Sequence, residues 1–167
     1  MENNSEVYAS AGVAERSRYY MGGLWKFHAT GKETAGQFAL MEVQARRGLE
    51  PPPHTHTKED ELYYLLEGSM QFTAAGKARI LEPGESIFLP KNIPHQFKVL
   101  SSEARFLVQV FPAGLEQMFI ALSMPAHTPT LPPLPAGPPP PEFLQKLKIL
   151  QQEYGITGID NTQIVAS

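Results

Sequence analysis

Two histidines separated by a single residue stand out in the stretch EPPPHTHTKEDELYYLLEG, residues 50–68. In an extended chain, residues i and i+2 point to the same face, so the side chains of His54 and His56 are expected to lie together. The prolines at positions 51–53 favour this geometry, because each fixes its own φ and disfavours helical backbone at the preceding residue. Two buried imidazoles need a polar partner, and a divalent metal ion supplies one. The pattern therefore predicts a metal site.

Two further residues could complete this site. Glu61 opens the apolar run LYYLLEG on the strand face that Tyr63 shares. His95 follows a proline turn and opens another short run, HQFKVL. Imidazole nitrogens with one carboxylate suit a single divalent Fe, Ni, Mn, Cu or Zn ion better than Ca or Mg. The predicted metal ligands are His54, His56, Glu61 and His95.

The remaining acidic and histidine residues that we considered are not expected to bind the metal ion. Glu59 and Asp60 compete with Glu61 for the carboxylate position, and we otherwise expect them to be surface acids near the mouth of the site. His28 lies in an apolar run and is expected to be a packing residue. His127 lies among prolines and is expected to be exposed to solvent.

Several side chains could form the walls of a pocket around the ion. Tyr63 and Phe97 each follow a proposed ligand by two residues on the same strand, so they are the preferred candidates. Phe72, Gln109 and Phe111 could also line the cavity, although ordinary core is the expected place for each of them taken singly.

The elements that must position these residues are short. From residue 24 to about residue 111, apolar runs of four to nine residues alternate with Gly, Pro or Asn. This spacing predicts an all-β antiparallel fold, and no run before Gly114 has the length and period of a helix. We expect an N-terminal arm at residues 1–18 and a single barrel at residues 19–123.

The C-terminal third is expected to contain helices and an extended proline-rich segment instead of strands. Residues 114–123 predict a short helix, and the proline-rich segment 124–141 is expected to run extended outside any sheet ladder. Residues 142–167 then predict an amphipathic helix and a tail, with Pro141 at the first helical position and Gly155 at the end. We expect this helix to pack on the barrel, with a lid or an exchanged subunit element as alternatives. Deletion from Pro141 onward is expected to change oligomeric state or access while metal stays bound.

Composition excludes several classes of function. The 167 residues carry a formal charge of -3 without a basic run, which argues against nucleic acid or an anionic membrane as a partner. The absence of cysteine excludes thiolate ligands and disulfides. Without an apolar run of membrane length or a signal-like N-terminus, we expect a cytoplasmic protein. Exposed strand edges lead us to expect a homodimer.

The polar positions also resemble those of the cupin family. The first cupin motif reads G, five residues, HxH, three or four residues, E, six residues, G. It is matched by Gly48, His54, His56, Glu61 and Gly68.

The second cupin motif reads G, five residues, PxG, two residues, H, three residues, N. It is matched at Gly84, Pro90 and His95, while Asn92 replaces the turn glycine and Val99 replaces the final asparagine. Asn tolerates the left-handed conformation, so the turn is expected to survive. One copy of each motif implies a single barrel.

Among cupins, the sequence is similar to small bacterial proteins that resemble quercetin dioxygenases. This resemblance implies an antiparallel β-barrel, also called a double-stranded β-helix or jelly roll, with one ion held by the four predicted ligands. Our main hypothesis is a metal-dependent dioxygenase acting on a small aromatic or hydroxylated substrate, with Glu61 as the catalytic base. Two alternatives remain, namely a non-catalytic module that binds metal and a small ligand, and an isomerase or lyase that uses the metal as a Lewis acid. The apolar, aromatic walls favour flat or apolar ligands over sugar phosphates.

Overall fold

The structure is a computed structural model that describes residues 16–158. Most of the expected N-terminal arm, residues 1–15, and the end of the tail, residues 159–167, lie outside the described residues. The strands of the described part are β1 (Ser17–Tyr20), β2 (Gly23–Ala29), β3 (Ala39–Arg46), β4 (Thr55–His56), β5 (Asp60–Glu67), β6 (Met70–Ala74), β7 (Lys77–Leu81), β8 (Ser86–Leu89), β9 (His95–Val99), β10 (Glu103–Phe111), β11 (Met124–Pro125) and β12 (Ile156–Thr157). The helices are α2 (Leu115–Leu122) and α3 (Pro141–Glu153).

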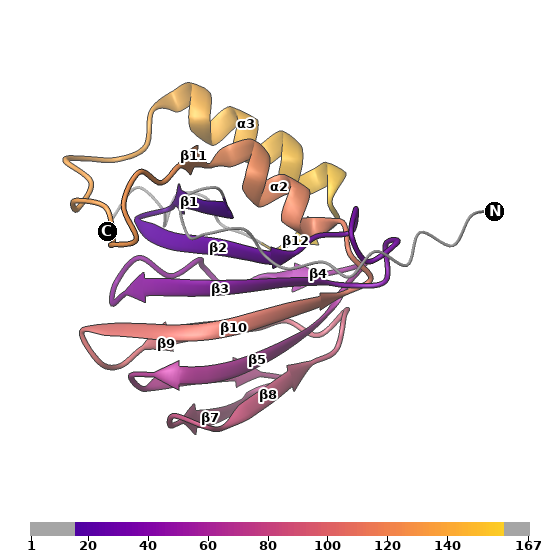
Figure 1. Cartoon of the computed structure of the whole chain (residues 1–167). Coiled ribbons are helices and arrows are strands. Elements are labelled where there is room, and N and C mark those ends of the chain that lie inside the picture. The colour runs from indigo at the N-terminus through magenta and orange to yellow at the C-terminus, as the bar shows by residue number, and fades with distance from the viewer. Residues whose placement is uncertain (1–15, 159–167) are drawn as a thin grey trace.

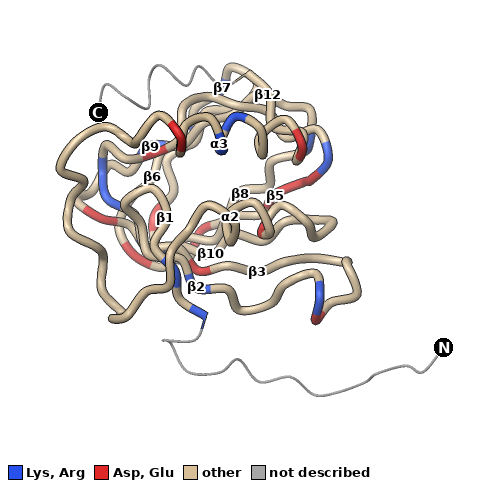
Figure 2. The backbone as a smooth tube through the Cα atoms, turned by 90° about the horizontal axis from the view of Figure 1, so that it is seen from above, with Lys and Arg blue, Asp and Glu red and all other residues tan. Residues whose placement is uncertain are grey.

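The strands form three antiparallel sheets. The large sheet has the order β11-β1-β2-β3-β10-β5-β8, the second has the order β7-β6-β9, and β12 pairs with β4 in the third (Figure 1). Viewed from above, the strands surround a common interior (Figure 2). The prediction of an all-β antiparallel fold with a short helix and a C-terminal helix is confirmed.

Alternation along the central strand decides which side chains reach the interior. In β10, Phe106 and Val108 are buried, whereas the intervening residues are half-buried on the outer face. Gln109 and Phe111 have this outer parity, and neither lines the cavity described below. Neither residue therefore lies in the core, which was the expectation, or in the pocket wall, which was the alternative, because a shift of one residue along a strand moves a side chain to the other face.

Both predicted helices are present and lie side by side at the β1–β2 end of the large sheet (Figure 1). Pro141 occupies the first turn of α3, and Gly155 follows the helix with φ of 76°. This left-handed conformation favours glycine. Leu147 is 1% exposed, so the apolar stripe of α3 packs against the barrel core as expected.

The proline-rich segment corrects one expectation. Its first two residues form β11, where Met124 pairs with Tyr19 and Pro125 with Arg18 of β1. The segment therefore does begin in a sheet ladder, and it can do so because β11 is an edge strand, where the missing N–H of proline costs little. β1 itself begins at Ser17, inside the range assigned to the arm. No helix among residues 16–158 has the length and apolarity that crossing a membrane would require.

Candidate metal centre

Backbone hydrogen bonds bring the two histidine-bearing segments together. The N–H of His54 donates to the carbonyl of His95 at 3.0 Å, and the N–H of His95 donates back at 2.9 Å. The N–H of Asn92 donates to the carbonyl of His56 at 2.7 Å, and Asn92 has φ of 64°, as expected for a residue at a glycine position. Segments about 40 residues apart are thus fixed side by side by main-chain contacts.

This pairing places three imidazoles in one cluster. His54, His56 and His95 are 8%, 3% and 4% exposed, and each offers a nitrogen within 4.8 Å of the nitrogens of the other two. The ring centroids lie 4.7 to 5.4 Å apart. The extended geometry expected from the three prolines therefore does direct both rings of the HTH segment to the same buried point.

The orientation of two rings is fixed by carbonyl groups two residues earlier in the chain. The Nδ1 atom of His54 lies 2.8 Å from the carbonyl oxygen of Pro52, and that of His95 lies 3.0 Å from the carbonyl oxygen of Ile93. Because a carbonyl only accepts, Nδ1 carries the proton in each ring and Nε2 keeps its lone pair. Both histidines are therefore in the tautomer that a metal ligand needs.

Glu61 lies beside this cluster on β5. Its Oε2 atom is 3.1 Å from Nε2 of His95 and 3.6 Å from Nε2 of His56, and the residue is 3% exposed. Burial raises the pKa of this carboxyl, but the neighbouring His56 and His95 outweigh it and bring the value to about 2. The side chain is therefore an anion at neutral pH.

The unsatisfied polar atoms of this region fit a bound cation. Five buried side-chain polar atoms have no hydrogen-bond partner among the described residues, and four of them belong to this site. They are His56 Nδ1, Glu59 Oε2, Glu61 Oε2 and His95 Nε2. The last two lie 3.1 Å apart, but without the geometry of a hydrogen bond. Unpaired buried polar atoms are costly, and an ion that accepts lone pairs from nitrogen and oxygen together would remove part of this cost.

Burial and neighbouring charges set the protonation of His54 and His56 in opposite directions. Burial, followed by the neighbouring His56 and His95, lowers the pKa of His54 to about 4, so this ring is neutral at pH 7. For His56, burial lowers the pKa, but Glu61 and Glu59 outweigh it and raise the pKa above its usual value. His56 therefore holds its proton more strongly than a free imidazole, because it lies between two carboxylates.

Tyr63 extends the site toward the interior. Its hydroxyl donates to Oε1 of Glu61 at 3.3 Å, on the side of the carboxylate away from the histidines. Burial and then the charge of Glu61 raise the pKa of Tyr63 well above its usual value, so the phenol stays protonated. Tyr63 also contacts Phe72, Phe97 and Phe106 in an aromatic cluster.

A cavity of about 110 Å³ opens beside the histidine cluster. Tyr63 and Phe97 line it, in line with their expected role as pocket walls, whereas Phe72 lies in the core and is not part of the lining. Sequence reasoning missed a second aromatic group that also lines the cavity, formed by Tyr20, Trp25 and Phe119 with ring centroids 4.6 to 5.5 Å apart.

The C-terminal region also contributes to the cavity wall. Leu147 and Gln151 of α3 and Ile156 of β12 line the cavity. β12 pairs directly with β4, so that Ile156 lies opposite His56. The apolar stripe of α3 could be recognised in the sequence and predicted that the helix packs on the barrel. It did not indicate that the helix lies beside the candidate metal site.

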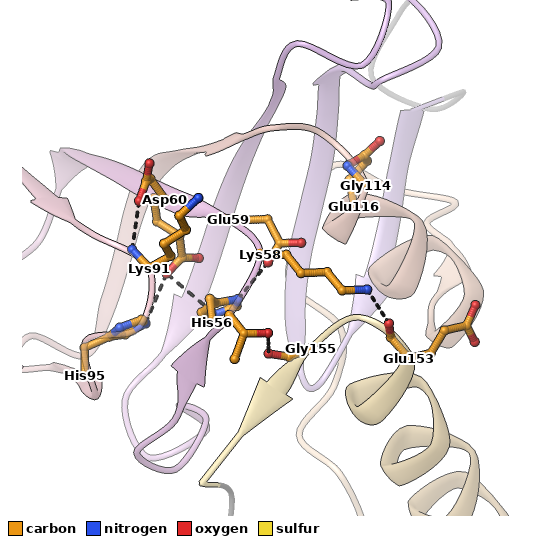
Figure 3. A network of polar contacts seen from close by, with 12 residues as sticks. His56, Lys58, Glu59, Asp60, Lys91, His95, Gly114, Glu116, Glu153 and Gly155 are labelled. Atoms are coloured by element: carbon orange, nitrogen blue, oxygen red, sulfur yellow. Dashed lines mark hydrogen bonds and ion pairs between the residues drawn. The ribbon is translucent and has the colours of Figure 1, made fainter.

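The expectation that Glu59 is a surface acid was wrong. Glu59 is 3% exposed, and its Oε2 atom lies 3.6 Å from Nδ1 of His56 (Figure 3). It precedes β5 and turns inward between β4 and β5. Asp60 is half-buried, and its Oδ1 accepts the backbone N–H of Lys91 at 2.8 Å.

The two remaining histidines lie away from the cluster. His28 is half-buried on the outer face of the large sheet, where its Nε2 lies 3.0 Å from Oε2 of Glu42, so it makes a polar contact rather than core packing. His127 is exposed, as predicted.

Comparison with known proteins identifies the family and the fold. Residues 39–111 match the family model described as "Cupin domain". A quercetin 2,3-dioxygenase from Aspergillus japonicus is 30% identical over 120 residues, which are 65% of this chain and 34% of that protein. A quercetin 2,3-dioxygenase from Bacillus subtilis is 28% identical over 102 residues, which are 61% of this chain and 30% of that protein. The chain thus spans about a third of the length of the curated relatives that it matches.

Solved structures agree on the fold. An RmlC-like cupin from Shewanella frigidimarina has a TM-score of 0.56 at 17% identity, with 67% of this chain and 96% of that chain covered. Structures described as a nucleoside dehydratase and as a predicted oxalate decarboxylase from Thermotoga maritima each reach a TM-score of 0.54 at 18% identity. They cover 68% and 62% of this chain and 88% and 98% of their own chains. The fold therefore hosts different reactions, and the matched motifs, sheets and family model together identify residues 39–111 as a cupin domain.

Proposed function

We propose that this cupin binds one divalent transition metal ion through His54, His56, His95 and Glu61. The observation that carries the proposal is the convergence of three buried imidazoles and an ionised carboxylate on one point beside a cavity. Two of the rings are already fixed by backbone carbonyls with Nε2 free. Such pre-organisation limits the ordering cost of binding an ion.

We further propose that the reaction is a dioxygenation, as in the quercetin 2,3-dioxygenases to which the chain is similar. Both atoms of dioxygen enter the substrate, which supplies all the electrons, so no external reductant is needed. Held by these four residues, the ion would supply Lewis acidity that activates a substrate hydroxyl toward dioxygen. The role of the surrounding residues is to bind, orient and deprotonate the substrate.

Glu61 is suited to take the substrate proton. It is anionic at neutral pH, and its Oε2 faces the histidine cluster while Oε1 accepts the hydroxyl of Tyr63. In the substrate complex, Oε2 gives up its place as a ligand and accepts the proton of a substrate hydroxyl, while the Tyr63 hydroxyl holds the carboxylate through Oε1. The aromatic walls exclude water and contact a flat ring.

The size of the cavity narrows the substrate class. Its volume of about 110 Å³ is smaller than the several hundred Å³ typical of sites for drug-sized ligands. The proposed substrate is therefore a single hydroxylated ring or a molecule of similar size, not a multi-ring flavonol.

Metal analysis and oxygen uptake test the proposal together. The untagged protein and its His95→Ala variant are compared by mass spectrometry for metal content, and then with an oxygen electrode against small catechols and hydroxyaromatic acids. We expect about one ion per chain of iron, nickel, manganese or copper, lost in the variant, and metal-dependent oxygen uptake. Zinc as the bound ion without oxygen uptake would favour the Lewis-acid isomerase or lyase instead, and absence of metal after reconstitution would contradict the metal site itself.

A further inference from the structure

Glu59 occupies a position that the proposed reaction does not use. Its carboxylate lies behind His56, where its Oε2 faces Nδ1 at 3.6 Å (Figure 3). Nε2 of the same ring faces Oε2 of Glu61 at 3.6 Å. Both facing atoms are buried, and neither has a hydrogen-bond partner among the described residues. The imidazole of His56 thus lies between two carboxylates, one on the metal side and one behind it.

The other two histidines of the cluster lack such a neighbour. Their Nδ1 atoms donate to the carbonyl oxygens of Pro52 and Ile93, which are neutral acceptors. A hydrogen bond to an ionised acceptor is roughly twice as strong as one between neutral groups. A carboxylate behind a metal-binding imidazole also makes Nε2 a more basic donor. His56 is therefore distinct within a cluster that is otherwise uniform.

The backbone around Glu59 is held from both sides. The N–H of Thr57 donates to the carbonyl of Gly155 at 3.0 Å, and Nζ of Lys58 donates to the carbonyl of Glu153 at 2.6 Å. The ladder of β5 begins at the next residue, Asp60. Only small rotations of the Glu59 side chain are needed to shorten the 3.6 Å contact to hydrogen-bond length.

Stability alone does not explain a buried carboxylate at this position. The nearest cation in sequence, Lys58, is engaged elsewhere, because its Nζ donates to the carbonyl of Glu153. Burying a carboxylate that lacks a strong partner is a net cost to folding. A cost of this kind is typical of residues retained for a site.

We infer that Glu59 is a positioning residue, which accepts the Nδ1–H of His56 and thereby fixes the tautomer and the ring orientation with Nε2 free for the ion. This inference rests on the proposed metal site. Glu59 itself touches neither ion nor substrate, so its effect passes entirely through the ring of His56.

Cobalt(II) titration of the metal-free protein tests this role. The affinity is measured by competition with a chelator for the wild type, Glu59→Gln and Glu59→Leu. Glu142→Gln serves as a matched control, because it removes one charge from an exposed position on α3. We expect Glu59→Gln to weaken cobalt binding by about 10-fold, within the range for residues that orient metal ligands, and Glu59→Leu to weaken it further. The visible d–d absorption of the cobalt protein should also shift in both variants but not in the control.

Unfolding of the metal-free variants separates positioning from a structural role. If Glu59 orients His56 for the ion, metal-free Glu59→Gln should melt at or above the midpoint of the metal-free wild type, because a buried charge is removed, while the cobalt-loaded variant melts below the loaded wild type. If Glu59→Gln lowers the melting midpoint equally in the metal-free and the cobalt-loaded protein, Glu59 has a structural role and the inference is overturned. Cobalt affinity within twofold of wild type with an unchanged spectrum would overturn it as well. Failure of the wild type to bind cobalt would overturn the metal site and this inference together.

Discussion

His54 and His95 are joined by a reciprocal pair of backbone hydrogen bonds, at 3.0 and 2.9 Å, while their side chains point to the same buried cluster. The main chain, not the side chains, therefore holds the two histidine-bearing segments together. A side-chain substitution at either position can remove a ligand without removing the contact that places it.

The first prediction concerns His95→Ala. We expect it to abolish stoichiometric metal binding while the far-ultraviolet circular dichroism of the metal-free protein stays unchanged, because the backbone pairing with His54 remains. His127→Ala is the control, since that ring is exposed and lies outside the cluster. Full metal content in His95→Ala would show that the ion is held elsewhere.

The second prediction concerns metal removal. We expect the ion to bind only the folded protein. A free ion concentration of about 100 times the Kd should then raise the free energy of unfolding by about 2.7 kcal/mol. For a chain of this size the midpoint of thermal unfolding should then fall by roughly 5 to 10 °C on chelation. Differential scanning calorimetry with and without chelator measures the shift, and identical midpoints would contradict a site that is coupled to the fold.

The third prediction concerns the pH dependence of the metal-free protein. The pKa of His54 is about 4 in the folded state against an ordinary 6.5, so the unfolded chain binds its proton first and stability falls as the pH drops from 6.5 to 4. The lowered pKa of Glu61, about 2 against 4.5, acts in the same direction at lower pH. The raised pKa of His56 acts oppositely, since its contribution is lost as the pH rises above 6.5. We therefore expect maximal stability near pH 6.5.

Urea denaturation between pH 4 and pH 9 measures this profile. The loss from pH 6.5 to pH 4 that is due to His54 should approach about 3 kcal/mol, from 1.36 kcal/mol per unit of pKa difference. His54→Gln should flatten that part of the profile. Stability that keeps increasing from pH 6.5 to pH 4 would contradict the assigned protonation state of His54.

The fourth prediction concerns the C-terminal helix. Leu147 is 1% exposed and lines the cavity, so Leu147→Ala should lower the free energy of unfolding by about 2 to 4 kcal/mol. Ile149 lies on the same helix but is 56% exposed, and Ile149→Ala should change stability by less than about 0.5 kcal/mol. Chemical denaturation of the two variants side by side gives the comparison, and equal effects would contradict the packing of α3 on the barrel.

Deletion from Pro141 onward is the more drastic change. On sequence grounds we expected the metal to stay bound, but the structure leads to a different prediction. Because β12 pairs with β4 and Gly155 accepts the N–H of Thr57, the deletion should free the strand that carries His56 and speed metal release. Stopped-flow chelation measures this rate. An unchanged rate of metal release would show that α3 and β12 only pack on the barrel and do not hold the metal site.

The sequence predicted most of the fold and the cluster for identifiable physical reasons. Period-two alternation indicated which face of β5 is buried, so Glu61 and Tyr63 were placed correctly on the interior face. The prolines before His54 indicated extended backbone, and the structure has it. These signals are local, and each depends on a few neighbouring residues.

The failures were of a different kind. The burial of Glu59 depends on the path of the chain between β4 and β5, and a run of three acids gives no sign of which one turns inward. Tyr20, Trp25 and Phe119 meet only because β1, β2 and α2 pack together, and no sequence period relates them. The predicted homodimer and cytoplasmic location stay predictions.

The pairing of β12 with β4 links residues that are far apart in the chain, since Ile156 lies opposite His56 and 100 positions after it. During synthesis, β4, which carries His56, leaves the ribosome long before the strand that pairs with it. The HTH segment must wait for both His95 and Ile156 before its backbone partners are complete. For the proposed metal site, ion loading is therefore expected to be a late event for the nascent chain, which would favour capture of whichever metal the completed protein meets.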